Sequence, residues 1–228
     1  SDTARQRLVS SLRGRLRRWV ALRLALLVRS VDEEVQRRAL PTFANQPRNL
    51  RLESPHRIVN AAAITIGDDV SLGPGCLLNA IRRYPGPFMA GAPDVKPQTF
   101  EPSIRIGNRV SATGYLTVGA VDSVVIEDDV LLASHIYIGD NLHGTERADV
   151  PYKYQPLGRI APVVIGRGSW IGEHVVILPG VEIGDFSVVG ANSVVTASIP
   201  PRSIAVGSPA RVVRRWSEEQ SQWVRAED

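Results

Sequence analysis

A six-residue repeat constrains the fold of this chain more than any other feature of its sequence. From Ile165 the residues read IGRGSW, IGEHVV, ILPGVE, IGDFSV, VGANSV and VTASIP, with an aliphatic residue first and usually glycine second. Nine of the fifteen leading residues are followed by glycine, although the chain has only 19 glycines among 228 residues, so composition alone does not produce the pattern. The leading residues are Ile66, Leu72, Leu78, Ile106, Ala112, Val118, Ile126, Leu132, Ile138, Ile165, Ile171, Ile177, Ile183, Val189 and Val195.

A unit of six residues is too short for a helix and fits one short strand plus a corner, where glycine tolerates unusual backbone angles. Three units make one triangular coil. Each leading side chain then points inward and stacks on the one three units later, as Ile165 on Ile183 and Ile171 on Val189. The predicted fold class is therefore an all-β solenoid, a parallel β-helix. A β-sandwich would instead show period-two alternation with turn signals about every 8 to 12 residues.

Two segments break the repeat, near 82–103 and near 140–162, and we expect both to be loops expelled from the prism. Long loops on a rigid scaffold tend to carry function. The regions outside the repeat are expected to be helical. The predicted organisation is an N-terminal helical and linker segment at 1–50, the β-helix at 51–213 and a short C-terminal helix at 214–228.

The N-terminal segment carries ten arginines between Arg5 and Arg38, together with leucines at roughly helical spacing. This pattern predicts an amphipathic helix or helix pair, broken near Gly14. Two roles stay open for it. The apolar stripe can cover the end of the prism or pack on other subunits, as solenoid caps do. It can instead rest on the inner membrane, with arginines paired to anionic headgroups.

Composition excludes several classes of protein. The net charge of +4 is modest and only 6% of residues are aromatic, whereas nucleic-acid binding takes a basic face interleaved with stacking aromatics. No apolar run reaches the roughly 18 residues of a membrane span and no signal-peptide layout is present, so cytoplasmic residence is expected. Cys76 is the single cysteine, and no Cys/His cluster has metal-ligand spacing, so we expect neither a disulfide nor a metal.

The closing coils, IGRGSWIGEHVVILPGVEIGDFSVVGANSVVTASIPPRSIAVGSPARVVRRW, are similar to those of sugar O-acetyltransferases of the hexapeptide-repeat family. A looser resemblance extends back to about Ile58 and is greatest to the lipopolysaccharide and exopolysaccharide branch. The resemblance implies a left-handed winding. It also implies transfer of an acetyl group from acetyl-CoA to a sugar hydroxyl in surface polysaccharide or glycolipid biosynthesis.

The segment VVIEDDVLLASHIYIGDNLH is similar to the coil that leads into the catalytic-histidine loop of this family, which makes His143 the expected general base. A sugar hydroxyl attacks a thioester poorly, and a histidine, which titrates near pH 6.5, can take its proton as the new bond forms. Cys76 falls at an inward position of its repeat and is expected to be a core residue, not an acyl carrier. Direct transfer within a ternary complex is therefore implied.

The donor site is carried over from the family by position, in a groove between neighbouring prisms. Arginines there suit the phosphates of CoA, which a guanidinium pairs bidentately, although they also fit a solvated basic tail. We also predict a homotrimer, because flat prism faces and expelled loops need partners. The expected donor contacts are Trp170, Glu173, Ala191, Thr196, Arg211 and Arg214.

The acceptor side matches the family less well. Relatives that act on small sugars carry asparagine and aspartate on the coil before the histidine loop. This chain has Thr113 at the first of these positions, and Asp122 is the candidate for the second. Tyr84, Tyr115 and Asp122 are the candidate residues of the acceptor groove. This departure leaves the acceptor undefined, so an amino sugar or another small acceptor stays an alternative.

Two rival functions also stay open. A γ-class carbonic anhydrase shares the prism but needs three zinc-binding histidines, of which His135 and His143 could be two. A non-catalytic trimeric scaffold would bind no CoA and would tolerate changes at His143. His56, His135 and His174 are otherwise expected to be structural or solvated, with His135 a secondary candidate for the acceptor groove.

Overall fold

The computed structural model describes residues 15, 17–28, 30–31, 40–86 and 96–226. The chain divides into two units, Ser1–Leu40 and Pro41–Asp228. In the first unit every described residue up to 31 is helical, as predicted, and Leu22 and Leu24 are both exposed on opposite sides of the helix. The predicted break at Gly14 lies outside the described residues. Within the described part, no helix is long and apolar enough to cross a membrane.

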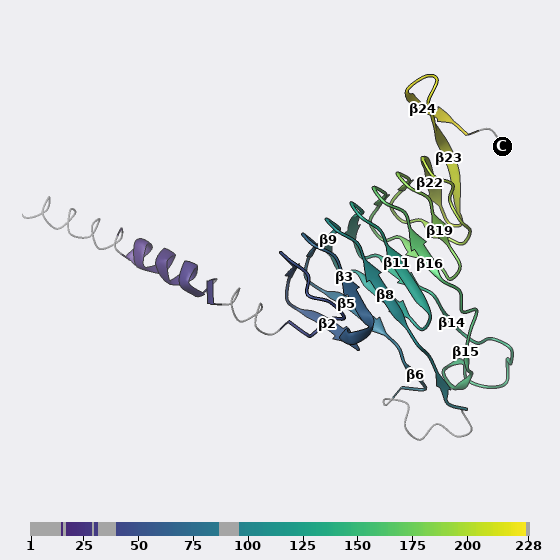
Figure 1. The fold of residues 1–228 in the computed structure, drawn as a ribbon, viewed down its shortest axis with the longest axis horizontal. Coiled ribbons are helices and arrows are strands. Elements are labelled where there is room, and N and C mark those ends of the chain that lie inside the picture. Colours follow the sequence, from purple (N-terminus) through teal and green to yellow (C-terminus); the bar gives the residue numbers. More distant parts are fainter. Residues whose placement is uncertain (1–14, 16, 29, 32–39, 87–95, 227–228) are drawn as a thin grey trace, which may run out of the picture. The chain divides into compact units, whose positions relative to one another are not determined.

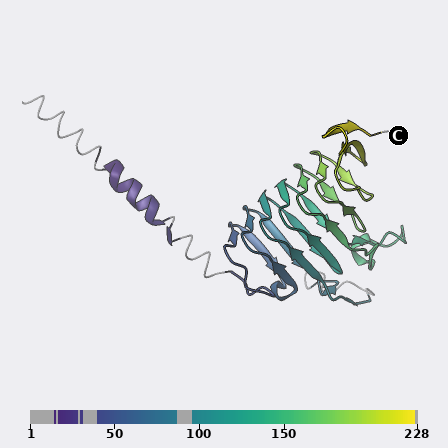
Figure 2. The ribbon, with the colours of Figure 1, turned by 45° about the horizontal axis from the view of Figure 1, so that its top comes forward.

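The second unit is a three-sided prism whose coils stack one on another (Figures 1 and 2). The first face consists of β1 (Arg51–Leu52), β4 (Ser71–Leu72), β9 (Ser111–Gly114), β12 (Leu131–Ser134), β17 (Trp170–Ile171), β20 (Val188–Val189), β22 (Ser203–Gly207), β23 (Ala210–Ser217) and β24 (Gln222–Arg225). The second consists of β2 (His56–Val59), β5 (Cys76–Ala80), β10 (Thr117–Ala120), β13 (Tyr137–Gly139), β18 (Val176–Ile177) and β21 (Val194–Val195). The third consists of β3 (Ile64–Ile66), β8 (Ser103–Ile106), β11 (Ser123–Ile126), β16 (Val163–Ile165) and β19 (Glu182–Ile183).

The core is the aliphatic stack that the repeat predicted. All fifteen leading residues are buried. Ile165 pairs with Ile183, and Ile171 pairs with Val189, across parallel strands of successive coils. The structure adds an earlier coil that the repeat did not mark, in which β1 and β2 pair in parallel with β4 and β5.

The coil between Ile106 and Ile126 is longer than the closing coils. Ile165 and its partner Ile183 are 18 residues apart, whereas Ile106 and its partner Ile126 are 20 apart. The extra length lies in the turn between β10 and β11, at Val121 and Asp122. The paired strands keep their register on both sides of this turn, so the expansion is confined to a corner.

The first coil is closed by the segment before it. Phe43 is buried, and the Ala44 backbone N–H donates to the Ile64 carbonyl at 2.9 Å. The Asn45 side chain donates to the Ile66 carbonyl at 2.7 Å and accepts from the Ile66 N–H at 3.0 Å. Residues 43–45 therefore occupy the outer edge of β3, an edge that would otherwise present unpaired backbone groups.

The C-terminal helix predicted at 214–228 is wrong, because β23 and β24 form an antiparallel hairpin there. Figure 1 shows this hairpin projecting from the last coils. Trp216 and Trp223 lie opposite each other, with ring centroids 5.5 Å apart in an edge-to-face arrangement. β23 also pairs with β22, so the sheet edge acts as a template for the hairpin. Cross-strand aromatic pairing and this edge outweigh the helical propensity of the polar residues between the tryptophans.

Candidate functional site

The two segments that break the repeat are expelled from the prism and pack on each other. The first forms the hairpin of β6 (Arg83–Tyr84) and β7 (Gln98–Thr99), and the second that of β14 (Leu142–His143) and β15 (Leu157–Gly158). Figure 1 shows β6, β14 and β15 on the same side of the stack. The Gln98 side chain donates to the Leu157 carbonyl at 3.1 Å and accepts from the Leu157 N–H at 2.7 Å, so it pairs with β15 as a strand would.

The loop that follows His143 is held in shape from within. The Gln155 side chain is 3% exposed and lies among the backbone groups of the loop. Its amide nitrogen donates to the carbonyls of Arg147 and Val150, and its oxygen accepts from the Arg147 N–H. A buried amide with three partners fixes the loop backbone without a large apolar core.

His143 lies in β14, is exposed to solvent and contacts the Tyr84 hydroxyl. The Tyr84 oxygen is 3.2 Å from His143 Nδ1, and the two rings meet edge to face with centroids 5.5 Å apart. The Tyr84 ring is 7% exposed and packs with Val121 and Leu157. Because the imidazole is exposed, it can exchange a proton with a bound hydroxyl, and its contact with Tyr84 fixes the orientation of the ring.

The Tyr84 hydroxyl also donates to the Lys153 carbonyl, at 2.5 Å. Burial raises the pKa of the Tyr84 phenol, so the group keeps its proton near neutral pH. Tyr84 was expected to contact the acceptor sugar. Its hydroxyl contacts Lys153 and His143 within the chain, and contact with the acceptor stays a prediction.

Asp122 lies on the long corner next to the histidine loop, and Asp140 holds it there. The Asp140 side chain is fully buried. Its carboxylate accepts hydrogen bonds from the backbone N–H of Val121 at 2.9 and 3.0 Å and from that of Asp122 at 2.7 Å. Asp140 is three residues before His143, so one buried side chain ties the candidate acceptor residue to the strand that leads into the candidate base.

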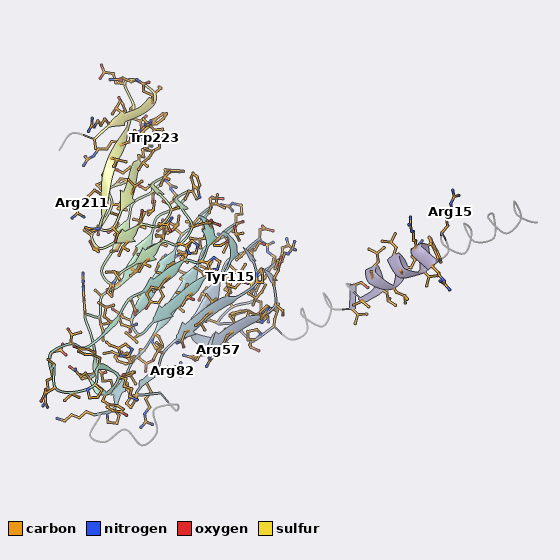
Figure 3. All side chains as sticks on the ribbon, turned by 180° about the vertical axis from the view of Figure 1, so that it is seen from behind. Arg15, Arg57, Arg82, Tyr115, Arg211 and Trp223 are labelled. Carbon is orange, nitrogen blue, oxygen red and sulfur yellow. The ribbon has the colours of Figure 1, made fainter. Side chains whose placement is uncertain are left out.

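The other acceptor candidate, Tyr115, belongs to a different corner. Its ring stacks on His135 with centroids 4.5 Å apart, and His135 stacks on His174 at 4.7 Å. This aromatic column connects the first face of the prism to the second, whereas His143 follows the second face. Figure 3 shows Tyr115 on the body of the prism, apart from the projecting loops. Within one chain the structure therefore does not bring Tyr115 and His143 together.

The same geometry bears on metal binding. His135 is held in the aromatic column, and His143 is on the expelled loop, so the two histidines do not share a site within one chain. Among the residues that the structure describes, no three His, Cys, Asp or Glu side chains are grouped so as to hold a metal ion.

The expected donor contacts follow the closing coils toward the C-terminus. Trp170 begins β17 and is exposed, and Glu173 and Ala191 are exposed on the corner of the aromatic column. Thr196 follows β21 and is half-buried. Arg211 and Arg214 are exposed on β23, and Figure 3 shows Arg211 on that hairpin. Thr196 follows the second face, as His143 does, whereas Trp170 is on the first face and the two arginines are on the C-terminal hairpin.

Sequence reasoning missed three groups at this site: the Lys153 carbonyl, the Asp140 carboxylate and the Gln98 amide. Each acts on a residue brought near by folding, and Tyr84 and His143 themselves are 59 positions apart. A repeat of six residues carries no signal for such contacts. The only available signal was at Asp140, an acidic residue directly after the Ile138–Gly139 step of the repeat.

Residues 162–197 match the family model "Bacterial transferase hexapeptide (six repeats)". The chain is 32% identical over 187 residues to the Escherichia coli (strain K12) protein named "Putative lipopolysaccharide biosynthesis O-acetyl transferase WbbJ", a match that covers 78% of this chain and 86% of the relative. It is 38% identical over 123 residues to the galactoside O-acetyltransferase of the same organism, which covers 53% of this chain and 58% of that protein.

Among solved structures, the chain is similar to the D94N mutant of AntD, an N-acyltransferase from Bacillus cereus crystallised with dTDP and coenzyme A. The TM-score is 0.61 at 21% identity, and the match covers 79% of this chain and 87% of that one. A likeness at this identity concerns the fold. The fold is a parallel β-helix, as the repeat predicted, with the left-handed winding that the family resemblance implied.

Proposed function

Because this chain belongs to the hexapeptide-repeat family of O-acetyltransferases, we propose that it transfers an acetyl group from acetyl-CoA to a sugar hydroxyl during the synthesis of a surface polysaccharide or glycolipid. The name of the E. coli relative, which matches along most of both chains, supports this substrate class. The observation that carries the mechanism is the exposed His143 ring, held between two interlocked loops.

In the proposed reaction, the acceptor hydroxyl attacks the thioester carbonyl while the His143 imidazole takes the hydroxyl proton. The carbon–oxygen bond forms, the carbon–sulfur bond breaks, and the proton passes on to the departing CoA thiolate. Cys76 takes no part, because its side chain is 1% exposed in the core and its thiol hydrogen-bonds to the Gly73 carbonyl. Transfer is therefore direct, within a complex of both substrates.

The proposed donor site is the groove lined by Trp170, Arg211 and Arg214, with the arginines paired to CoA phosphates. We propose that this groove is completed by a second copy of the chain in a homotrimer. Leu131 and Trp170 are neighbours on the first face and are 48% and 51% exposed. A flat face with an exposed Leu–Trp pair suits burial against another subunit, since aromatic residues are enriched in such interfaces.

The assay that tests the function incubates the full chain with labelled acetyl-CoA and a panel of nucleotide sugars, oligosaccharides and lipid-linked glycans. O-acetylation of a sugar is the expected result. Transfer to an amino group would redefine the acceptor, and absence of CoA binding would favour the scaffold alternative. Sedimentation equilibrium is expected to give three chains per particle, and a monomer under active conditions would contradict the shared groove.

The N-terminal helix keeps its two candidate roles, packing within the assembly or peripheral contact with the membrane at which a lipid-linked acceptor is held. The described helix carries Arg17, Arg18 and Arg23 beside exposed leucines. Arginines near an anionic bilayer each contribute about 1 kcal/mol, an attraction that salt screens. We propose a cytoplasmic location, where the CoA thioester is supplied, with this contact at the inner membrane.

Sedimentation with liposomes separates the two roles. Membrane contact predicts binding to anionic vesicles at low salt, release as salt rises, and loss of binding without loss of folding when residues 1–38 are deleted. Failure to bind, or aggregation of the truncated chain, would assign the helix to packing within the assembly.

A further inference from the structure

The contacts of the Tyr84 hydroxyl fix the direction of two hydrogen bonds. A phenol has one proton and can donate once. The Lys153 carbonyl is only an acceptor, so at 2.5 Å the Tyr84 proton points toward it. Because burial raises the pKa of the phenol, this proton is retained at neutral pH. The side of the Tyr84 oxygen that faces His143 therefore carries lone pairs.

A lone pair on Tyr84 needs a donor at His143 Nδ1, 3.2 Å away. If Nδ1 carried no proton, two lone pairs would face each other across this contact. The neutral ring has one proton, so a proton on Nδ1 leaves Nε2 bare. We propose that Tyr84 is a positioning residue that holds His143 in the Nδ1–H tautomer, so that Nε2 is the nitrogen that takes the acceptor proton.

This role rests on the proposed function of His143 as a base, and it specifies which ring nitrogen accepts the proton. A histidine in the opposite tautomer would present an N–H to the acceptor hydroxyl, and it could not remove a proton through that nitrogen. Elsewhere in proteins, the group bonded to one ring nitrogen selects the tautomer and orients the ring. Here the selecting group comes from one expelled loop, and the carbonyl that orients it comes from the other.

The packing of the two loops is what brings Tyr84 to the Lys153 carbonyl. Tyr84 is on β6 and Lys153 is in the short 3₁₀ helix Tyr152–Tyr154, after β14. The Tyr84 hydroxyl can point its proton at the Lys153 carbonyl only when the two loops are in contact. The Gln98 amide, bonded to both backbone groups of Leu157, is a second contact between the loops, separate from the packing of Tyr84 on Leu157 and away from His143.

The test is Tyr84→Phe in the full chain, read by ¹⁵N-histidine NMR and by kinetics. Phenylalanine keeps the ring packing and removes the oxygen. In the parent protein the His143 signals are expected to show protonated Nδ1 and bare Nε2 at a pH where the ring is neutral. In the variant both tautomers are expected, with kcat lowered about tenfold and the KM for acetyl-CoA unchanged.

Gln98→Ala is the matched control, because it removes two contacts between the loops and leaves Tyr84 in place. It is expected to keep the parent tautomer. If it produces the same tautomer mixture as Tyr84→Phe, or if the parent protein shows bare Nδ1, the positioning role is wrong. The NMR readout does not depend on turnover, so an inactive protein with Nδ1–H in the parent would reject the proposed function and leave the tautomer assignment intact.

Discussion

The closing coils and the coil that leads to His143 share one repeat, but they differ in how strictly they keep it. From Ile165 to Val195 the aliphatic ladder runs without insertion. The coil before it is two residues longer at Asp122 and ends in the loop that carries His143. The regular region places its residues in a uniform apolar stack, whereas the irregular region places a buried carboxylate, a buried phenol and an exposed imidazole close together.

A solenoid core leaves little freedom for chemistry within its strands. Every inward position is needed for stacking on the coils above and below. Corners are different, because a turn can lengthen without shifting the register of the strands it joins. We therefore expect substitutions in the ladder to change stability, and substitutions at the corners to change catalysis.

The largest effect is expected at the loop. His143→Ala should lower kcat by about 10²- to 10⁴-fold, because the acceptor hydroxyl loses its base. The KM for acetyl-CoA and the thermal midpoint should stay close to those of the parent, since the side chain is exposed. His56→Ala, which removes a histidine from β2, serves as the control and should keep its turnover. Near-normal turnover in His143→Ala would remove this residue from the mechanism.

Substitutions in the aliphatic stack should instead lower stability and leave kcat unchanged. Ile183 is fully buried between Ile165 and the residues of the next coil. Ile183→Ala should reduce the free energy of unfolding by about 2–5 kcal/mol, through lost burial and the cavity that remains. Chemical denaturation measures this change, and Ile183→Val should cost only about 0.5–1.5 kcal/mol. If the alanine variant loses kcat while keeping its stability, the division between ladder and corner fails.

Asp140 tests the junction between the two regions. Asp140→Asn replaces one carboxylate oxygen by an NH₂ group that faces backbone N–H donors, so one or more of those donors loses its acceptor. The free energy of unfolding should fall by about 1–3 kcal/mol. The KM for the acceptor should rise while the KM for acetyl-CoA stays constant, because the turn at Asp122 is released. Loss of stability with both KM values unchanged would make Asp140 a structural residue only.

The smallest effect on activity is expected at Cys76. Burial raises the pKa of its thiol, so the nucleophilic thiolate is disfavoured. Cys76→Ala should keep kcat within about twofold and lose about 1 kcal/mol of stability, the typical cost of a small core truncation. Mass spectrometry of the parent after incubation with labelled acetyl-CoA should find no acyl-enzyme, and a labelled thioester on Cys76 would overturn direct transfer.

The sequence predicted those parts of the molecule that depend on neighbours at fixed spacing. The stacked aliphatic positions, the two expelled loops and the inward Cys76 are of this kind. The C-terminal hairpin was missed because it depends on pairing with β22 and on two tryptophans seven positions apart. The contact of Tyr84 with His143 and the Lys153 carbonyl was not predicted, because it joins two separate loops and backbone groups leave no mark on composition.

The Asn45 amide at the first coil has a consequence for self-assembly. A stack of parallel coils resembles a growing polymer, since each finished edge is a surface on which an identical unit can add. Asn45 satisfies the donor and the acceptor of Ile66 with a side chain that ends there, as a monofunctional end group stops a polymer chain. At Ile66, the β3 edge therefore offers no free backbone groups with which a second molecule could pair to extend a fibre.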